Sequence, residues 1–359
     1  MTSAGQFTAD VVRSDKTLAD PDGPARQKAF SHPINHMRGL AIVPIVAGHC
    51  YNALNWQPGS MGAHLTALWA DLNILFIFIS GFLFQHLLGR FVYKAYLKAK
   101  LRNVIMPYLV MSVPALALYA SGLKVHPHFG DLIASLPATE RLGLLLLTGA
   151  QMGPYWFIPM MAVFYLIAPL LAAIDRRPWW YLSLAPLFLL SITLVPRPLY
   201  DLQPLQSALH YLPIYMLGMF VSHYHSRIVP LLAQGWFVMA PIAVLLAALI
   251  VAADYAGIVF DRLPIATFLC LTLLSLLARF TRHRIASMDV LARYSFGIFF
   301  VHAYFVAGVR VVFERWPALA QGSQWRFLLV LAIVLSLTMA TVWLVRRLFP
   351  GRSRMLIGS

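Results

Sequence analysis

The residues best placed for chemistry are an arginine at the start of the first apolar stretch and a histidine deep inside it. Arg38 and His49 lie eleven residues apart in the segment HMRGLAIVPIVAGHCY. At about 100° per residue they differ by about 20° beyond three turns, so a helix presents both on one face. The rise of about 1.5 Å per residue separates them by about 16 Å along the axis. Pro44 lies between them and is expected to kink the helix.

This pair would join a cation near one membrane surface to an imidazole deep in the bilayer. Ionisable side chains inside a span are costly and are candidates for function. A histidine is the commonest general base for activating a hydroxyl group, because its pKa lies near neutrality. Two structural alternatives stay open: Arg38 as a topological anchor and His49 as a hydrogen-bonded core histidine.

The composition requires a membrane setting for these residues. Hydrophobic residues make up 60% of the 359 residues and charged residues only 11%, against about 25% charged in ordinary globular domains. The net charge of +15 comes from basic residues in short stretches between apolar segments, which is typical of membrane topology and argues against nucleic-acid binding. The two cysteines, Cys50 and Cys270, form neither a disulfide framework nor a CxxC pair.

Apolar segments long enough to cross a bilayer recur along the chain and predict an all-α, polytopic transmembrane helix bundle of about ten spans. A further apolar stretch, 142–153, is short and fits a re-entrant or interfacial segment. The ten ranges are 39–56, 66–88, 104–121, 155–174, 179–195, 206–223, 235–253, 263–280, 291–312 and 325–346.

The distribution of Lys and Arg predicts that both termini are cytoplasmic. With the N-terminus inside, 21 of the 28 basic residues fall in cytoplasmic stretches, as the positive-inside rule requires. No apolar signal-peptide core is visible near the N-terminus. We therefore expect a flexible cytoplasmic tail at 1–30, a membrane-embedded domain at 31–348 and a short basic cytoplasmic tail at 349–359.

Five motifs resemble the acyltransferase-3 family of integral membrane acyltransferases. Arg38 and His49 match its Arg-x10-His signature, and the other motifs follow in the family's order over about 30–346. One position departs from the pattern, because Asn103 stands where many relatives have another arginine. The other four motifs are FIFISGFLF at 76–84, KAYLKAKLRNVIMPYLV at 94–110, YWFIPMMAVFYLIAPLL at 155–171 and YSFGIFFVHAYF at 294–305.

The resemblance implies transfer of an acyl group, usually acetyl, from a cytoplasmic acyl-coenzyme A to a hydroxyl of a cell-envelope glycan or glycolipid. The donor acetyl-CoA, or another acyl-CoA, is then a substrate, and no permanently bound cofactor is expected. His49 would be the base, although a covalent acyl-histidine stays open. The implied location is the bacterial inner membrane. No metal is expected, since His49, His126 and His302 lack metal-ligand spacing.

Basic residues at the predicted cytoplasmic face are candidates for binding the coenzyme's phosphates, because arginine binds phosphate through two parallel hydrogen bonds and lysine as a point charge. Basic loops are also expected at this face for topology alone. The candidates are Arg38, Lys98, Lys100 and Arg102.

The second predicted span carries three polar candidates. Ser80 and Asn73 are seven residues apart and share a helix face, so either could line the site, and Ser80 could donate to the thioester oxygen. Asp71 is nine residues before Ser80, on the opposite side of an ideal helix. It is a candidate for orienting His49 or, alternatively, an interfacial charge.

Three further site-lining candidates come from the later motifs. Trp156 and Tyr165 lie in the fourth predicted span, where aromatic residues are also common as an interfacial belt. His302 lies deep in the ninth predicted span and could equally make a structural hydrogen bond. All three side chains are expected near the site because of the motifs that contain them.

Two other classes of function compete with an acyltransferase. A transporter or flippase of a glycan or lipid intermediate also needs polar residues within a helix bundle, but it does not require the Arg38–His49 pair with the later motifs. The chain shows no internal repeat of the kind many transporters carry. A purely structural membrane subunit would tolerate replacement of His49.

Overall fold

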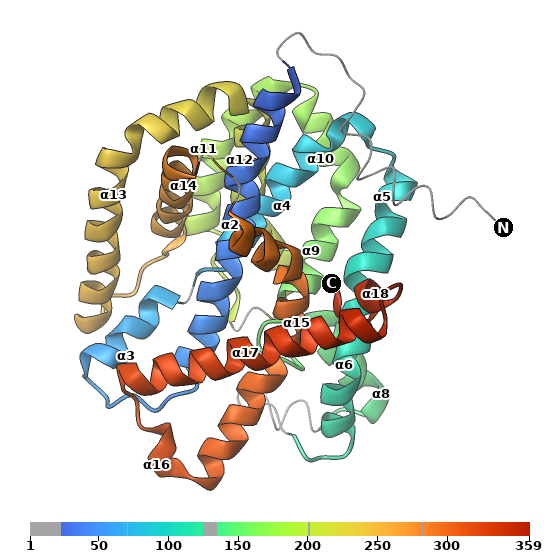
Figure 1. Ribbon diagram of the computed structural model, residues 1–359, viewed down its shortest axis with the longest axis vertical. Coiled ribbons are helices and arrows are strands. Elements are labelled where there is room, and N and C mark those ends of the chain that lie inside the picture. The colour runs from blue at the N-terminus through green and yellow to red at the C-terminus, as the bar shows by residue number, and fades with distance from the viewer. Residues whose placement is uncertain (1–22, 70, 125–134, 200–201, 282, 284) are drawn as a thin grey trace, which may run out of the picture.

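The computed structural model describes residues 23–69, 71–124, 135–199, 202–281, 283 and 285–359, and these residues form a helical bundle (Figure 1). Their one β-type pairing is an isolated parallel bridge between Asn55 and Gln321. An all-helical fold is thus confirmed for the described residues. In chain order the elements are α2 (Gly23–Tyr51), α3 (Met61–Leu65), η2 (Thr66–Trp69), α4 (Ile74–His86), η3 (Leu88–Arg90), α5 (Tyr93–Lys100), the π-helical turn η4 (Leu101–Ile105), α6 (Met106–Ala120), α8 (Ala138–Thr148), α9 (Phe157–Leu166), α10 (Ala168–Asp175), η5 (Pro178–Ser183), α11 (Leu184–Thr193), α12 (Pro204–His223), α13 (His225–Tyr255), α14 (Leu263–Phe280), α15 (Ala286–Arg315), α16 (Pro317–Ala320), α17 (Gln324–Leu348) and α18 (Ser353–Ile357).

Each of the ten ranges expected to span the membrane is helical over most of its length. In the described residues, six helical segments are long and apolar enough to cross a bilayer, and the pair α9 and α10, bent by 60°, would make a seventh. The number ten is therefore not confirmed. Helices α2 and α12, of 29 and 20 residues, are long enough to cross but carry polar side chains such as His49 and His210. Pro178–Thr193 is apolar but shorter.

Lipid-facing and protein-facing helices differ in how much of their apolar surface is covered. Helix α13 lies at the edge of the bundle in Figure 1, and only 11% of its most apolar stretch is buried. Its exposed Phe237, Val244 and Leu245 form an apolar surface that water would not solvate favourably but lipid would. In the segment Met61–His86, which includes α4, 53% of the corresponding stretch is buried. Helix α13 therefore leaves the larger share of its apolar surface uncovered by protein.

Contacts between segments distant in sequence occur within two groups of residues, which the predicted topology assigns to opposite sides of the membrane. Side chains and backbone groups pair within each group. In the group expected outside, Asn55 pairs with Gln321, His64 with Asp254 at 2.9 Å and Arg197 with Asp71 at 2.8 Å. In the group expected inside, Asn35 pairs with Asp289 at 2.6 Å, His223 with Asp175 at 2.8 Å and the Ile285 amide with His36 at 3.2 Å. Which group faces the cytoplasm stays a prediction.

Glycines allow the closest helix crossings. Helices α4 and α12 form the most extensively packed pair in the described bundle. A Cβ atom added at Gly81 would overlap the carbonyl oxygen of Tyr215, and one added at Gly218 would overlap that of Phe78. Gly39 similarly brings α2 against the backbone of α15 at Met288. Small residues at such crossings let helix backbones approach and gain van der Waals contact within a membrane.

The two expected tails are only partly described. Residues 1–22 of the expected N-terminal tail lie outside the described residues, and α2 begins at Gly23. In the expected C-terminal tail, α18 places the buried side chain of Ile357 against Val301 and Val342. The Arg346 guanidinium also donates to Ser359 Oγ at 3.2 Å. The last residues therefore pack onto α15 and α17, while the domain boundaries stay predictions.

The Gly81→Ala variant is expected to destabilise the bundle, because the added methyl group meets the backbone of α12 rather than a flexible side chain. Overpacking of this kind costs about 1–3 kcal/mol, measurable as a lower unfolding temperature in detergent micelles. The matched control is Gly143→Ala in α8, where nothing lies within 4 Å of the added Cβ. Equal unfolding temperatures for the two variants would contradict the close crossing of α4 and α12.

Candidate active site

His49 lies in the last turn of α2 and opens onto a cavity of about 650 Å³. Its side chain is half-buried, so the imidazole is enclosed by the bundle but reachable from the cavity. Helix α2 continues through Pro44 without ending there. The residues lining the cavity are Ile45, Gly48, His49, Asn52, Trp69, Leu72, Asn73, Tyr119, Lys124, Gly149, Ala150, Gln151, Met152, Gly153, Trp156, Arg197, Pro198, Leu199, Leu202 and Arg310.

A short loop between α8 and α9 forms the wall opposite the imidazole. A Cβ atom on Gly153 would lie 3.6 Å from His49 Cε1, an ordinary contact distance. The loop leaves α8 at Gly149, whose φ of +79° is the left-handed conformation that favours glycine. The missing side chain at Gly153 thus leaves space beside the Cε1 and Nδ1 edge of the imidazole.

Buried hydrogen bonds fix this loop to two helices. Gln151 Nε2 donates to Tyr108 Oη at 3.0 Å and to Ser112 Oγ at 2.8 Å, both on α6. Tyr155 Oη donates to the Phe300 carbonyl oxygen of α15 at 3.0 Å. Buried polar groups held by several partners rigidify their surroundings. The loop therefore holds a defined position against His49.

His302 on α15 is brought next to His49, with 5.3 Å between the two ring centroids. Its side chain is fully buried, and its Nδ1 lies 2.8 Å from the Ile298 carbonyl oxygen. Since a carbonyl oxygen only accepts, Nδ1 carries a proton, and in the neutral ring Nε2 is an acceptor. Within the described residues, Nε2 has no hydrogen-bond partner. His302 is thus a buried neighbour of the His49 ring.

The three polar candidates of the second predicted span, Asp71, Asn73 and Ser80, have different surroundings. Asn73, at the start of α4, lines the cavity. The Asp71 carboxylate accepts a hydrogen bond from Arg197 at 2.8 Å, which places a charge pair at the cavity. Ser80 is half-buried on α4 but does not line the cavity. Asn73 is therefore the polar side chain of this segment best placed to meet a ligand.

The two aromatic candidates have different surroundings. Trp156 lines the cavity, stacks on Tyr211 with ring centroids 6.0 Å apart and lies 5.5 Å beneath the Arg197 guanidinium. Tyr165 is buried on α9, and the Lys100 ammonium lies 4.8 Å from its ring centre. Only Trp156 meets the cavity of His49.

Arg38 occupies the same helix as His49 but does not line the cavity. Its guanidinium donates to Asn35 Oδ1 at 3.0 Å, and Asn35 in turn donates to Asp289 Oδ1 at 2.6 Å. Its Nε is buried and has no hydrogen-bond partner in the described part of the chain. The arginine is thus held near α15 with donor capacity left over.

Comparison with known protein families identifies the family of this helical chain. The model of the acyltransferase-3 family, described as an acyltransferase domain, matches residues 32–347, nearly the whole chain. The chain belongs to this family. Neither the curated proteins nor the solved structures gave a match. The resemblance carried by the five motifs is therefore confirmed, and the protein is a membrane acyltransferase in the general sense.

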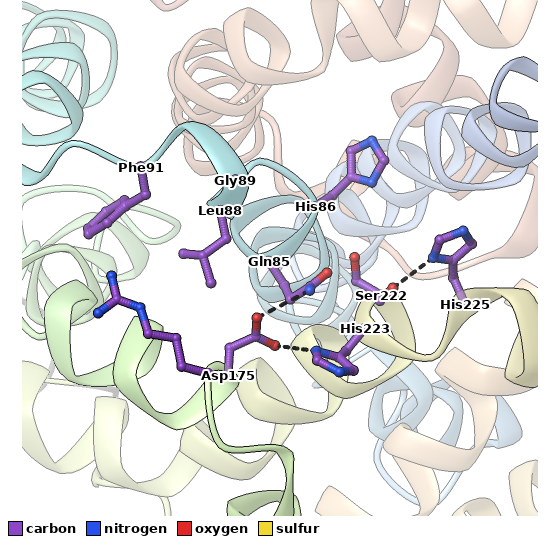
Figure 2. A pocket seen from close by; sticks show the side chains of 10 residues that line it. Gln85, His86, Leu88, Gly89, Phe91, Asp175, Ser222, His223 and His225 are labelled. Carbon is purple, nitrogen blue, oxygen red and sulfur yellow. Dashed lines mark hydrogen bonds and ion pairs between the residues drawn. The ribbon is translucent and has the colours of Figure 1, made fainter. Parts of the chain in front are cut away.

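In this acyltransferase, a second cavity of about 490 Å³ lies at the connections expected on the cytoplasmic side. Asp175 lines this cavity, and Figure 2 shows Gln85 and His223 pointing toward its carboxylate. The carboxylate accepts hydrogen bonds from Gln85 Nε2 at 3.3 Å and from Tyr181 Oη at 2.6 Å, and lies 2.8 Å from His223 Nδ1. This network joins α4, α10, η5 and α12.

The three lysine and arginine candidates near α5 also lie away from the His49 cavity. Lys98 and Arg102 are exposed on α5 and η4, whereas Lys100 is half-buried beneath aromatic rings. A π-helical turn such as η4 often marks a functional site. The exposed side chains of Lys98 and Arg102 are thus accessible to a ligand at the protein surface.

Sequence reasoning did not select several residues that complete the cavity. Lys124 and Arg310 line it together with Gln151 and Gly153. A signal existed for the two cations, because they belong to the minority of basic residues outside the predicted cytoplasmic stretches. Nothing in the sequence distinguished Gln151 or Gly153, since their role depends on how the loop folds back against His49.

Access to the two central histidines gives a test of this acyltransferase cavity that does not depend on activity. Diethyl pyrocarbonate modifies neutral imidazoles that it can reach, so we expect rapid modification of His49 and little of the fully buried His302. Gly153→Leu should slow the modification of His49 by filling the space opposite its ring. Peptide mass spectrometry of the detergent-solubilised protein measures both sites.

The control for that test is Gly153→Ala. Its Cβ would make an ordinary contact with His49, so it should leave the modification rate close to that of the wild type. Protection of His49 in the wild type, or equal rates for His49 and His302, would contradict the described cavity.

Proposed function

We propose that this protein is a membrane O-acyltransferase that moves an acyl group, most simply acetyl, from acyl-coenzyme A to a hydroxyl of an envelope glycan. The observation that carries the proposal is the position of His49 on a cavity of about 650 Å³ in a member of the acyltransferase-3 family. Cavities of this size are typical of small-ligand sites. The aromatic rings of Trp69 and Trp156 in its lining offer apolar faces to a sugar ring.

The chemistry assigns the first proton transfer to His49. The imidazole accepts the proton of the acceptor hydroxyl while the oxygen attacks the thioester carbonyl carbon. The tetrahedral intermediate then releases coenzyme A as a thiolate, which takes up the proton from the imidazolium. The side-chain amide of Asn73, which lines the same cavity, would donate to the developing oxyanion.

The donor is proposed to enter from the end of α2 that holds Arg38. The helical rise separates Arg38 from His49 by about 16 Å, a length comparable with the extended pantetheine arm of coenzyme A. Arg38 and the exposed Lys98 and Arg102 would then bind its phosphates. Lys100 would position Tyr165 through its contact with that ring. Phosphates and thioester would thus occupy opposite ends of one helix.

The His49→Ala variant is expected to insert and fold but to lose activity. Removal of a general base lowers kcat by about 100- to 10,000-fold. The measurement is mass spectrometry of envelope glycans from cells lacking the gene, complemented with the wild type, with His49→Ala or with the control His283→Ala. His283 is exposed between α14 and α15, so that control should restore the acyl group. Acylation by His49→Ala at the wild-type level would refute the base role.

Neutralising Arg38 is expected to weaken use of the donor. Arg38→Gln removes a cation proposed to bind phosphate, so the KM for acetyl-CoA should rise about tenfold or more, while Arg38→Lys should recover part of it. Initial rates in membranes, followed by release of the coenzyme thiol, measure both constants. Arg352→Gln, an exposed arginine, is the control. An unchanged KM in Arg38→Gln would remove Arg38 from the donor site.

A further inference from the structure

The cavity of His49 has a strongly one-sided charge in the part of the chain that the structure describes. Three basic side chains line it, and none of its described lining residues is an aspartate or glutamate. The three are Lys124 after α6, Arg197 after α11 and Arg310 on α15. Cations supplied by three separate segments thus meet at the cavity that holds the candidate base.

One of these cations already has a carboxylate partner. Arg197 is paired with Asp71 at 2.8 Å and lies over the ring of Trp156. Its contribution to the field in the cavity is therefore largely cancelled by Asp71. In the described lining, Lys124 and Arg310 are the basic side chains that make no contact with a described carboxylate.

The contacts that Lys124 makes with described residues are to neutral groups. Its ammonium donates to the Gln151 carbonyl oxygen at 2.8 Å, contacts Met152 Sδ at 3.6 Å and lies 5.0 Å from the ring centre of Tyr119. Burial lowers the pKa of Lys124, and the nearby positive charge of Arg310 lowers it further. The ammonium is thus held in an unfavourable field that a bound anion would relieve.

Arg310 reaches the cavity as an exposed side chain on α15. Among the described residues it makes no ion pair with a carboxylate. A cation that only fixed topology or bound lipid would be expected on the outer surface of the bundle, as Arg315 is five residues later. Arg310 instead shares the cavity with His49.

We propose that the acceptor of this acyltransferase is anionic, with a carboxylate or phosphate that Lys124 and Arg310 bind while its hydroxyl meets His49. This inference rests on the proposed function and names the class of acceptor for the same site. Arginine binds either anion through two hydrogen bonds, and lysine adds a point charge. The anionic group itself does not react: the oxygen–carbon bond forms at the hydroxyl and the carbon–sulfur bond of the thioester breaks.

The test uses membranes that contain the full chain, radiolabelled acetyl-CoA and envelope material from cells lacking the gene as the acceptor pool. The labelled product is separated by anion exchange. We expect it to be retained as an acidic glycan. Carboxyl reduction will abolish the retention if the group is a carboxylate, and mild hydrofluoric acid cleavage will abolish it if the group is a phosphate.

Substitutions of Lys124 and Arg310 test whether these two cations bind the acceptor's anionic group. Lys124→Gln combined with Arg310→Gln should raise the KM for the acidic acceptor about tenfold or more, as expected for lost charge-assisted hydrogen bonds, and leave the KM for acetyl-CoA unchanged. Arg315→Gln, which removes an exposed cation of the same helix outside the cavity lining, should match the wild type.

The outcomes separate this inference from the proposed function. A labelled product without charge, or an unchanged acceptor KM in the double variant, overturns the anionic acceptor and leaves the acyltransferase intact. A neutral product together with a raised acceptor KM in the double variant would also overturn the anionic acceptor, and would mean that Lys124 and Arg310 bind lipid headgroups instead. No labelled product above the His49→Ala background overturns the proposed function, and the inference falls with it.

Discussion

Close approach of helix backbones is the constraint on which the rest of this bundle depends. Within a bilayer, apolar side chains gain little by leaving lipid, so helices associate through van der Waals contact and internal hydrogen bonds. Gly81 and Gly218 let α4 and α12 touch without intervening side chains, and Gly39 does the same for α2 and α15. The second crossing brings the helix of His49 beside the helix of His302, with 5.3 Å between the two rings.

The side chain of His49 is half-buried in the bundle and is also reachable from a cavity. The residue stands in the last turn of α2, whose described side chains from His32 onward are buried or half-buried, and a loop with Gly153 faces its ring. Hydrogen bonds from Gln151 and Tyr155 hold that loop to α6 and α15. A cavity wall fixed in this way keeps a defined space beside His49, which is the condition for positioning a ligand there. The same helix carries Arg38 into a separate polar cluster with Asn35 and Asp289.

Charge is distributed unevenly between the two cavities. In the cavity that Asp175 lines, the carboxylate is bonded to the neutral donors Gln85 and Tyr181 and contacts His223 (Figure 2). The cavity of His49 gathers cations and, in its described lining, no carboxylate. Long-range fields of this kind concentrate ligands of opposite charge. The two cavities thus differ in the charged side chains of their described lining.

The sequence by itself determined the helical class, the positions of the apolar segments and the Arg38–His49 spacing, because hydropathy and helical period are local properties. It also identified the family through its ordered motifs. It did not determine which helices contact lipid, because length and hydropathy do not show which side chains other helices cover. Helices α2 and α12 are long enough to cross the membrane, yet most of their described side chains are packed inside the bundle. Only the tertiary structure brought Lys124, Gln151, Gly153 and Arg310 to His49, because each comes from a distant segment and its place depends on how helices cross and loops fold back.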